Sequence, residues 1–221
     1  MTPWLLLIFS YIVGSIPFSV LLGRICCGLD IREHGSGNPG TTNVFRVLGK
    51  RVGFAVFFLD MLKGGFVILL IRLGWFNDNH FHPLLYGLMA AIGHIYPVFL
   101  NFKGGKAVAT SVGILLFYAP VLGVLGLLTF FFVLGFTRFV SLASCGGTLA
   151  AMIASYIVFF IGPSEASSWV YIFGVQGDVI MIIVTTLGSS LILYRHRKNF
   201  INIAKGIEPK VFFLRKKPHK E

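Results

Sequence analysis

The stretch AVATSVGILLFYAPVLGVLGLLTFFFVLGFT, residues Ala107–Thr137, carries no charged side chain over its 31 residues. A membrane-spanning helix needs about 20 apolar residues, so the stretch is long for one span and short for two full ones. Pro120 lies near its middle, and a proline inside a helix removes a hydrogen bond and clashes with the preceding turn. We therefore predict two short helices joined near Tyr118-Ala119-Pro120.

Apolar segments of similar character lie on both sides of this stretch. The chain of 221 residues is 56% hydrophobic with a mean hydropathy of +0.83, which is outside the range of soluble domains. The predicted spans are Pro3–Gly23, Gly53–Leu73, Pro83–Leu100, the two halves of Ala107–Thr137, Leu142–Ile161 and Tyr171–Tyr194. No basic segment precedes the first span, so we interpret it as a retained helix rather than a cleaved signal peptide. We expect an all-α integral membrane protein with seven transmembrane helices, forming a single polytopic domain over residues 1–221.

The distribution of positive charge predicts the orientation of these spans. The chain carries 19 Lys and Arg against 8 Asp and Glu, a net charge of +11. With seven spans and the N-terminus outside, 17 of the 19 basic residues face the cytoplasm, including all nine of a basic tail over about residues 195–221. The positive-inside rule favours this arrangement. We expect the tail to contact anionic membrane lipids, and we expect no nucleic-acid partner because no nucleic-acid-binding motif is visible.

A glycine-rich polar segment, GSGNPGTTN at Gly35–Asn43, lies on the predicted cytoplasmic face. Its glycines permit close approach of backbone to a ligand, and successive amides can form an anion-binding nest. Side-chain donors come from Ser36, Asn38, Thr41, Thr42 and Asn43. Arg46 follows three residues later, and no GxxxxGK[ST] nucleotide loop is present. A polar turn between two spans has a similar composition, but we predict phosphate binding.

A second glycine-rich turn, Lys103-Gly104-Gly105-Lys106, places two cations on the same predicted face. A lysine ammonium suits a phosphate oxygen, although plain positive-inside anchoring also places lysines there. The segments Arg138-Phe139-Val140-Ser141 and Arg195-His196-Arg197-Lys198-Asn199 fall on this face as well. Four segments far apart in the chain can therefore build one site.

A few polar residues outside these turns are candidates for supporting roles. Asp60 and Lys63 lie at i and i+3 within the second predicted span, where they either pair with each other or form a polar wall under the site. His196 either acts as a general base, donates to a phosphate or belongs to a basic interfacial anchor. Glu208 is an acid in a basic tail. No set of metal ligands with the usual spacing is visible, so we expect neither a metal nor a cofactor.

Taken together, these segments resemble one family, the bacterial membrane acyl-phosphate:glycerol-3-phosphate acyltransferases known as PlsY. The matching stretches are GSGNPGTTNVFRVLGK (Gly35–Lys50), GHIYPVFLNFKGGKAVAT (Gly93–Thr110), TRFVSLAS (Thr137–Ser144) and HRKNFINIAKGIEPK (His196–Lys210). GSIPFS (Gly14–Ser19) and DMLKG (Asp60–Gly64) also fit, and the match runs in order over nearly the whole chain. The departures are small. Thr41 stands where the family often has alanine, Ala107 where it often has glycine, and Phe200 where isoleucine is common.

The resemblance implies a multi-pass enzyme of the bacterial cytoplasmic (inner) membrane with its active site on the cytoplasmic side. The implied reaction moves a fatty acyl group from acyl phosphate to the 1-hydroxyl of sn-glycerol 3-phosphate. Its products are 1-acylglycerol 3-phosphate (lysophosphatidic acid) and inorganic phosphate, and it is the first acylation of phospholipid biosynthesis. Besides the two substrates and membrane lipids, the resemblance implies an upstream enzyme that makes acyl phosphate as a partner.

The residues and the resemblance together give a hypothesis for the site. The expected acyl-phosphate-binding residues are Ser36, Gly37, Asn38, Gly40, Thr41, Thr42 and Asn43. Those expected for glycerol 3-phosphate are Arg46, Lys103 or Lys106, Ser141, His196 and Asn199. Catalysis is assigned to His196, Asn199, Lys103 and Ser141, with Asp60, Lys63 and Glu208 in support.

In this hypothesis the hydroxyl attacks the acyl carbon directly, because acyl phosphate is an activated mixed anhydride that needs mainly positioning and charge stabilisation. The proton passes to the departing phosphate, which we favour, or to His196. The competing interpretation is a transporter or flippase for an organic phosphate. Its expected signature, broken helices in two matched halves, is not visible in the sequence.

Overall fold

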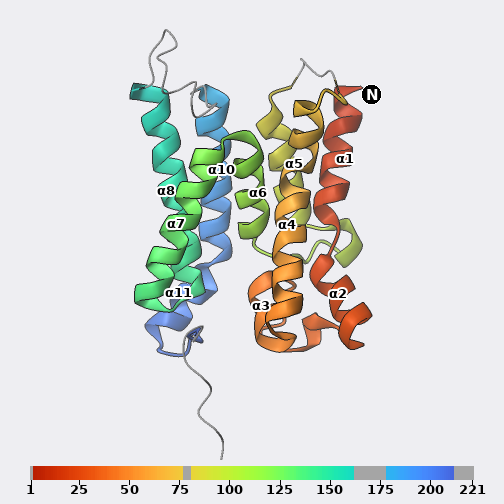
Figure 1. Ribbon diagram of the computed structural model, residues 1–221. Coiled ribbons are helices and arrows are strands. Elements are labelled where there is room, and N and C mark those ends of the chain that lie inside the picture. The colour runs from red at the N-terminus through yellow and green to blue at the C-terminus, as the bar shows by residue number, and fades with distance from the viewer. Residues whose placement is uncertain (1, 77–80, 162–177, 212–221) are drawn as a thin grey trace, which may run out of the picture.

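The structure is a computed structural model that describes residues 2–76, 81–161 and 178–211 (Figure 1). Within these ranges the chain is helical and contains no strand. The elements are α1 (Pro3–Ser15), α2 (Phe18–Cys27), the 3-10 turn η1 (Ile31–Glu33), α3 (Thr41–Val47), α4 (Gly49–Arg72), α5 (Pro83–Ile95), the 3-10 turn η2 (Val98–Leu100), α6 (Val108–Tyr118), α7 (Pro120–Thr137), α8 (Val140–Ile161), α10 (Val179–Arg195) and α11 (Arg197–Ala204).

The predicted break at Pro120 is confirmed. Helix α6 ends at Tyr118, Ala119 has non-helical backbone angles, and Pro120 takes the first position of α7. Proline suits that position because the amide it lacks would have no partner within the helix. With 11 residues, α6 is only about 17 Å long, which is too short to cross a bilayer unaided.

Other described helices are long and apolar enough to cross a membrane. There are five such segments: Pro3–Cys27, Gly49–Arg72, Pro83–Leu100, Pro120–Thr137 and Val140–Phe160. A sixth arises if α10 and α11, which meet at an angle of 45°, are taken together. A helical, multi-pass membrane fold is therefore confirmed. The last predicted span begins at Tyr171, which lies outside the described residues. Helix α10 begins at Val179, and the Asp178 side chain caps it by accepting a hydrogen bond of 2.6 Å from the Met181 amide.

The first predicted span, Pro3–Gly23, lies within a segment long and apolar enough to cross a membrane, Pro3–Cys27, but its helix is not continuous. Helix α1 ends at Ser15 and α2 begins at Phe18, because Pro17 has no amide to continue the helical hydrogen bonds. The third predicted span is also interrupted: α5 ends at Ile95, ahead of Pro97, and the chain continues into η2. The residue before a proline is disfavoured in helical geometry, which explains this ending.

Helix α6 packs against α4, α5 and α7 and joins two groups of helices. In Figure 1, α1, α4 and α5 stand on one side of it and α7, α8 and α10 on the other. Glycines allow the closest of these contacts. A methyl group on Gly64 of α4 would lie 2.1 Å from the Thr110 oxygen, and one on Gly113 of α6 would lie 1.8 Å from the Met61 oxygen. Helices α2, α3 and α11 lie at the end of the molecule opposite to the N-terminus, which we call the α11 end (Figure 1).

Candidate active site

Several predicted site residues meet in one hydrogen-bonded network at the α11 end. The Lys106 ammonium, just before α6, donates to Oδ1 of Asn199 on α11. Nδ2 of Asn199 donates to Oε1 of Glu208 at 2.7 Å, and the Ser141 hydroxyl on α8 donates to the same oxygen at 3.2 Å. The two donors hold the Glu208 carboxylate between α8 and α11. The carboxamide of Asn199 is thereby oriented with its oxygen toward Lys106.

The chain reaches this arrangement through a bend and a turn. The bend is at His196, between α10 and α11. Beyond α11, Gly206 has a positive φ of 71°, a conformation that costs glycine little. The amides of Ile207 and Glu208 then donate to the Asn202 carbonyl at 2.9 and 3.2 Å. This turn brings Glu208 back against α11 and places its carboxylate in the network.

His196 is buried beside the network. Its Nδ1 lies 2.8 Å from the Ile192 carbonyl oxygen, which can only accept, so Nδ1 carries the hydrogen. Burial, and then the charge of Lys106, lower the pKa of His196 to about 4. The imidazole is therefore neutral near pH 7, and its Nε2 is left with a lone pair that accepts a hydrogen bond.

Lys106 is the half-buried cation of the second glycine-rich turn, whereas Lys103 is exposed. Burial, with smaller effects of the charges of Arg195 and Arg46, lowers the pKa of Lys106 to about 8 against the opposing charge of Glu208. Lys106 is still mainly an ammonium at pH 7. Arg46 belongs to α3, which overlaps the end of the first glycine-rich segment, so one of these charges comes from that part of the chain.

The backbone of the second glycine-rich turn is held from both sides. The amides of Gly104 and Gly105 donate to the carbonyls of Ile95 and His94, at 3.0 and 3.1 Å. The Arg195 guanidinium donates to the carbonyls of Gly104 and Gly105, at 2.9 and 3.1 Å. The amides of Gly104 and Gly105 are therefore used in hydrogen bonds within the protein. The groups of this turn that can reach a ligand are its lysine side chains. This role of Arg195 was not predicted, and its position beside His196 is the signal in the sequence that points to it.

The first glycine-rich segment is closed by Asn43, which is buried. Its Oδ1 accepts the Ser36 amide at 2.9 Å, and its Nδ2 donates to the carbonyls of His34 and Ile31 at 2.9 and 3.1 Å. The carboxamide of Asn43 is thus engaged by the backbone of residues 31–36. Helix α3 begins at Thr41, so Asn43 lies in its first turn. Of the other predicted residues, Ser36 and Gly37 are exposed, Asn38, Thr41 and Thr42 are half-buried, and Gly40 is buried.

Asp60 and Lys63 form a buried ion pair of 2.7 Å on α4. This is the pairing that their i, i+3 spacing allows. Both side chains also line a small cavity together with Gly104 and Gly105 of the second turn. Asp60 and Lys63 therefore pair with each other and also lie next to the second glycine-rich turn.

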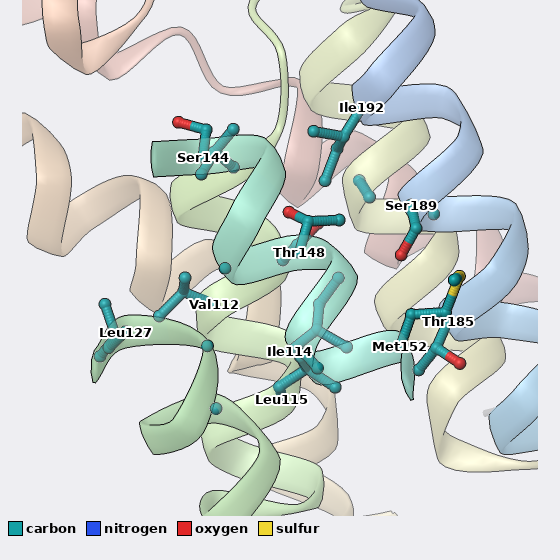
Figure 2. A pocket seen from close by; sticks show the side chains of 18 of the residues that line it. Val112, Ile114, Leu115, Leu127, Ser144, Thr148, Met152, Thr185, Ser189 and Ile192 are labelled. Atoms are coloured by element: carbon teal, nitrogen blue, oxygen red, sulfur yellow. The ribbon is translucent and has the colours of Figure 1, made fainter. Parts of the chain in front are cut away.

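An apolar cavity of about 130 Å³ lies between the helices (Figure 2). It is lined by residues of α4 to α8 and α10. Ser144 lies one turn beyond Ser141 on α8, and Ile192, whose carbonyl binds His196, lies at the same end of the cavity (Figure 2). Helical periodicity did not reveal this cavity, because it depends on how six helices pack. The chain is therefore a membrane protein with cationic and hydrogen-bonding groups within one helical turn of an apolar cavity.

The family model described as glycerol-3-phosphate acyltransferase matches residues 4–206 of the chain. The chain is 45% identical over 213 residues to the glycerol-3-phosphate acyltransferase of Bacillus cytotoxicus, covering 96% of this chain and 97% of the relative. It is 43% identical over 210 residues to that of Bacillus subtilis, covering 95% and 98%.

Two solved structures have the same fold. Both are crystal structures of PlsY (YgiH), an integral membrane glycerol 3-phosphate acyltransferase. The glycerol 3-phosphate form matches with a TM-score of 0.80 and 34% identity, covering 97% of this chain and 98% of that one. The lysophosphatidic acid form matches with a TM-score of 0.78, 34% identity and 97% coverage of both chains. The chain belongs to the PlsY family of membrane glycerol-3-phosphate acyltransferases, and it is an acyltransferase of phospholipid synthesis.

Proposed function

We propose that this enzyme transfers a fatty acyl group from acyl phosphate to the 1-hydroxyl of sn-glycerol 3-phosphate, giving lysophosphatidic acid and inorganic phosphate. The observation that carries the proposal is the Lys106–Asn199–Glu208–Ser141 network, whose Ser141 lies one helical turn of α8 from Ser144 in the wall of the apolar cavity. This arrangement suits a reaction that joins a hydrocarbon chain to a small phosphorylated alcohol. The solved relatives support it, because one is in a glycerol 3-phosphate form and the other in a lysophosphatidic acid form.

The acceptor's phosphate binds between Lys106 and Arg46, which supply a half-buried ammonium and an exposed guanidinium. Asn199 holds the Lys106 ammonium in place, and Glu208 holds Asn199. The Ser141 hydroxyl donates its hydrogen to Glu208, so its lone pairs accept a hydrogen bond from a glycerol hydroxyl. Lys103, which is exposed, adds charge at the approach to the site.

The donor binds with its acyl chain in the cavity and its phosphate on the first glycine-rich segment. Ser36, Asn38, Thr41 and Thr42 supply hydroxyl and amide donors at that segment, and Gly37 and Gly40 let the backbone approach the phosphate. Asn43 maintains the shape of the loop through its three hydrogen bonds to backbone.

In the chemical step the acceptor's 1-hydroxyl attacks the acyl carbon, an ester C–O bond forms, and the bond to the phosphate oxygen breaks. A neutral His196 accepts a hydrogen bond from this hydroxyl through Nε2. The proton goes to the departing phosphate oxygen, because the negatively charged phosphate is a much stronger base than His196, whose pKa is about 4. His196 therefore orients the hydroxyl.

The site faces the cytoplasm in this proposal, with the N-terminus outside. The seven membrane segments are α1 with α2, α4, α5, the short α6, α7, α8 and α10. The break at Pro120 and the concentration of Lys and Arg near the α11 end support this topology. The membrane is then the bacterial cytoplasmic membrane, where phospholipid synthesis begins.

Purified protein in detergent, mixed with palmitoyl phosphate and glycerol 3-phosphate, tests the proposal. We expect equal amounts of inorganic phosphate and lysophosphatidic acid, and only when both substrates are present. Palmitoyl-CoA replaces palmitoyl phosphate in the control and should give no product. Phosphate release without glycerol 3-phosphate, or lysophosphatidic acid made from the thioester, would contradict it, and a transporter would give neither product.

A further inference from the structure

Three ionisable side chains lie deep between α4 and α5, away from the proposed substrate contacts. Asp60 is 2% exposed, Lys63 5% and His94 8%. Asp60 and Lys63 pair at 2.7 Å, and Nδ1 of His94 lies 3.7 Å from Oδ1 of the same aspartate. Charges inside a membrane domain are costly and mark functional positions. The contacts around this cluster show what it connects.

Toward the N-terminus, Lys63 reaches the break between α1 and α2. Its ammonium donates to the Ile16 carbonyl at 2.7 Å and lies 5.6 Å from the centre of the Phe18 ring. At the next residue of α2, the Ser19 hydroxyl donates to the Pro39 carbonyl at 3.0 Å. Because Pro39 belongs to the first glycine-rich segment, Lys63 and Ser19 together tie that segment to α4.

Toward the other side, His94 contacts the second glycine-rich turn. Its carbonyl accepts the Gly105 amide at 3.1 Å, and a methyl group on Gly105 would lie only 2.1 Å from Nε2 of the imidazole. His94 therefore packs directly on the backbone of the turn that carries Lys106. The two glycine-rich segments therefore contact the same buried cluster from opposite sides.

A small cavity of about 10 Å³ lies within this cluster. Asp60, Lys63 and His94 line it, together with Pro39 of the first segment and Gly105 of the second. The volume is close to that of one water-sized sphere, and polar groups surround it. Nδ1 of His94 has no hydrogen-bond partner among the described residues, although it is buried. The 3.7 Å between Nδ1 of His94 and Oδ1 of Asp60 is too long for a direct hydrogen bond, and a water molecule in the cavity beside them can bond to both atoms.

We propose that Asp60, Lys63 and His94, with one water molecule between His94 and Asp60, form a positioning joint that sets the distance between the two glycine-rich segments. The joint acts on catalysis through those segments: it holds the donor's phosphate site at a fixed distance from Lys106. This consequence for catalysis rests on the proposed function, whereas the distance between the segments is a property of the free protein. The two can therefore be tested separately.

The test measures the distance between spin labels on cysteines introduced at Ser36 and Lys103, which are both exposed. The three native cysteines, Cys26, Cys27 and Cys145, are first replaced by serine or alanine. We expect a narrow distance distribution in this parent protein and a broad one after His94→Ala. His94→Gln, which keeps a polar group opposite Asp60, should restore most of the narrow distribution.

Ser19→Ala provides a second variant, because it removes only the link to Pro39 and leaves the buried charges in place. It should broaden the distribution as well. Its matched control is Ser10→Ala, which removes a similar buried hydroxyl whose bond, to the Tyr86 carbonyl at 2.5 Å, lies away from the joint. The control should leave the distribution unchanged.

Activity in the unlabelled variants supplies the second readout. His94→Ala and Ser19→Ala should raise KM for both substrates and lower kcat/KM at least fivefold, while Ser10→Ala stays within twofold of the parent. An unchanged distance distribution in Ser19→Ala and His94→Ala would overturn the joint. A broadened distribution with unchanged kinetics would leave the joint standing and count against its role in catalysis. An experimental structure with a direct His94–Asp60 hydrogen bond and no water between them would overturn the water site.

Discussion

Replacing Glu208 by alanine removes the group that orients Asn199 and, through it, Lys106. The lost bond between Asn199 and Glu208, 2.7 Å long, has a charged acceptor, and such bonds contribute about 1.5–3 kcal/mol. At 1.36 kcal/mol for each factor of ten, this loss lowers kcat/KM for glycerol 3-phosphate by roughly 10- to 150-fold. Most of the effect should be in the acceptor's KM, because the phosphate of the acceptor is the group that Lys106 binds.

Glu208→Gln separates the charge from the contact. The glutamine keeps an acceptor oxygen for Asn199 and Ser141, and it loses the charge together with the long hydrogen bond of 3.4 Å that Oε2 accepts from Asn202. The difference between charged and neutral hydrogen bonds is about 1 kcal/mol, so we expect a decrease of roughly fivefold. Glu33→Ala is the matched control, because Glu33 is an exposed acid in η1, outside the network, and its kinetics should be unchanged.

The assay is phosphate release at saturating palmitoyl phosphate with glycerol 3-phosphate varied, on detergent-purified variants whose melting temperatures are also measured. A Glu208→Ala enzyme that melts like the parent and keeps kcat/KM within threefold would refute the reasoning. Equal losses in Glu208→Ala and Glu208→Gln would show that charge alone, and not the orientation of Asn199, is responsible.

Three further predictions concern the proton, the cation and the acyl chain. Because His196 has a pKa of about 4, the ratio of kcat/KM between the parent and His196→Gln should stay constant from about pH 5.5 to 7.5. The kcat of His196→Gln should be only about tenfold below that of the parent. A ratio that declines below pH 6.5, or a 10²–10⁴-fold loss of kcat, would indicate a general base. Because Lys106 loses its proton near pH 8 rather than 10.5, kcat/KM for glycerol 3-phosphate should fall with rising pH above about 8. Lys106→Arg should abolish that fall, and Lys103→Arg should retain it. Gly188 lines the cavity with open space at its Cβ position, so Gly188→Phe should shift the preference to shorter acyl phosphates, while Gly135→Phe, equally open but outside the cavity, should not.

The sequence predicted those features of the fold that depend on local backbone chemistry. Pro120 lies within a charge-free stretch, and it marks the boundary of α6 and α7 as expected. Pro17 carries the same signal, but the apolar residues around it favoured one continuous helix, and the break before α2 was missed. The short α11 was also missed, because its eight residues are fewer than the window of about 11 or more over which helical periodicity is recognised.

The candidate site was predictable as a set of segments and not as a set of contacts. Polar residues in an apolar chain identified the segments that carry Lys106, Ser141 and Asn199. Composition does not reveal which atoms are already engaged within the protein. The carboxamide of Asn43 closes its own loop, and Arg195 holds the carbonyls of the glycine turn from about 90 residues away. Such contacts depend on tertiary packing, which leaves no pattern in a single sequence.

An experimental structure of this protein with glycerol 3-phosphate bound tests the central claim most directly. The account predicts the phosphate of the ligand about 2.7–2.9 Å from Nζ of Lys106, with the 1-hydroxyl directed toward Nε2 of His196 and the mouth of the apolar cavity. A phosphate bound at the exposed Lys103, with Lys106 and His196 out of contact with the ligand, would contradict it.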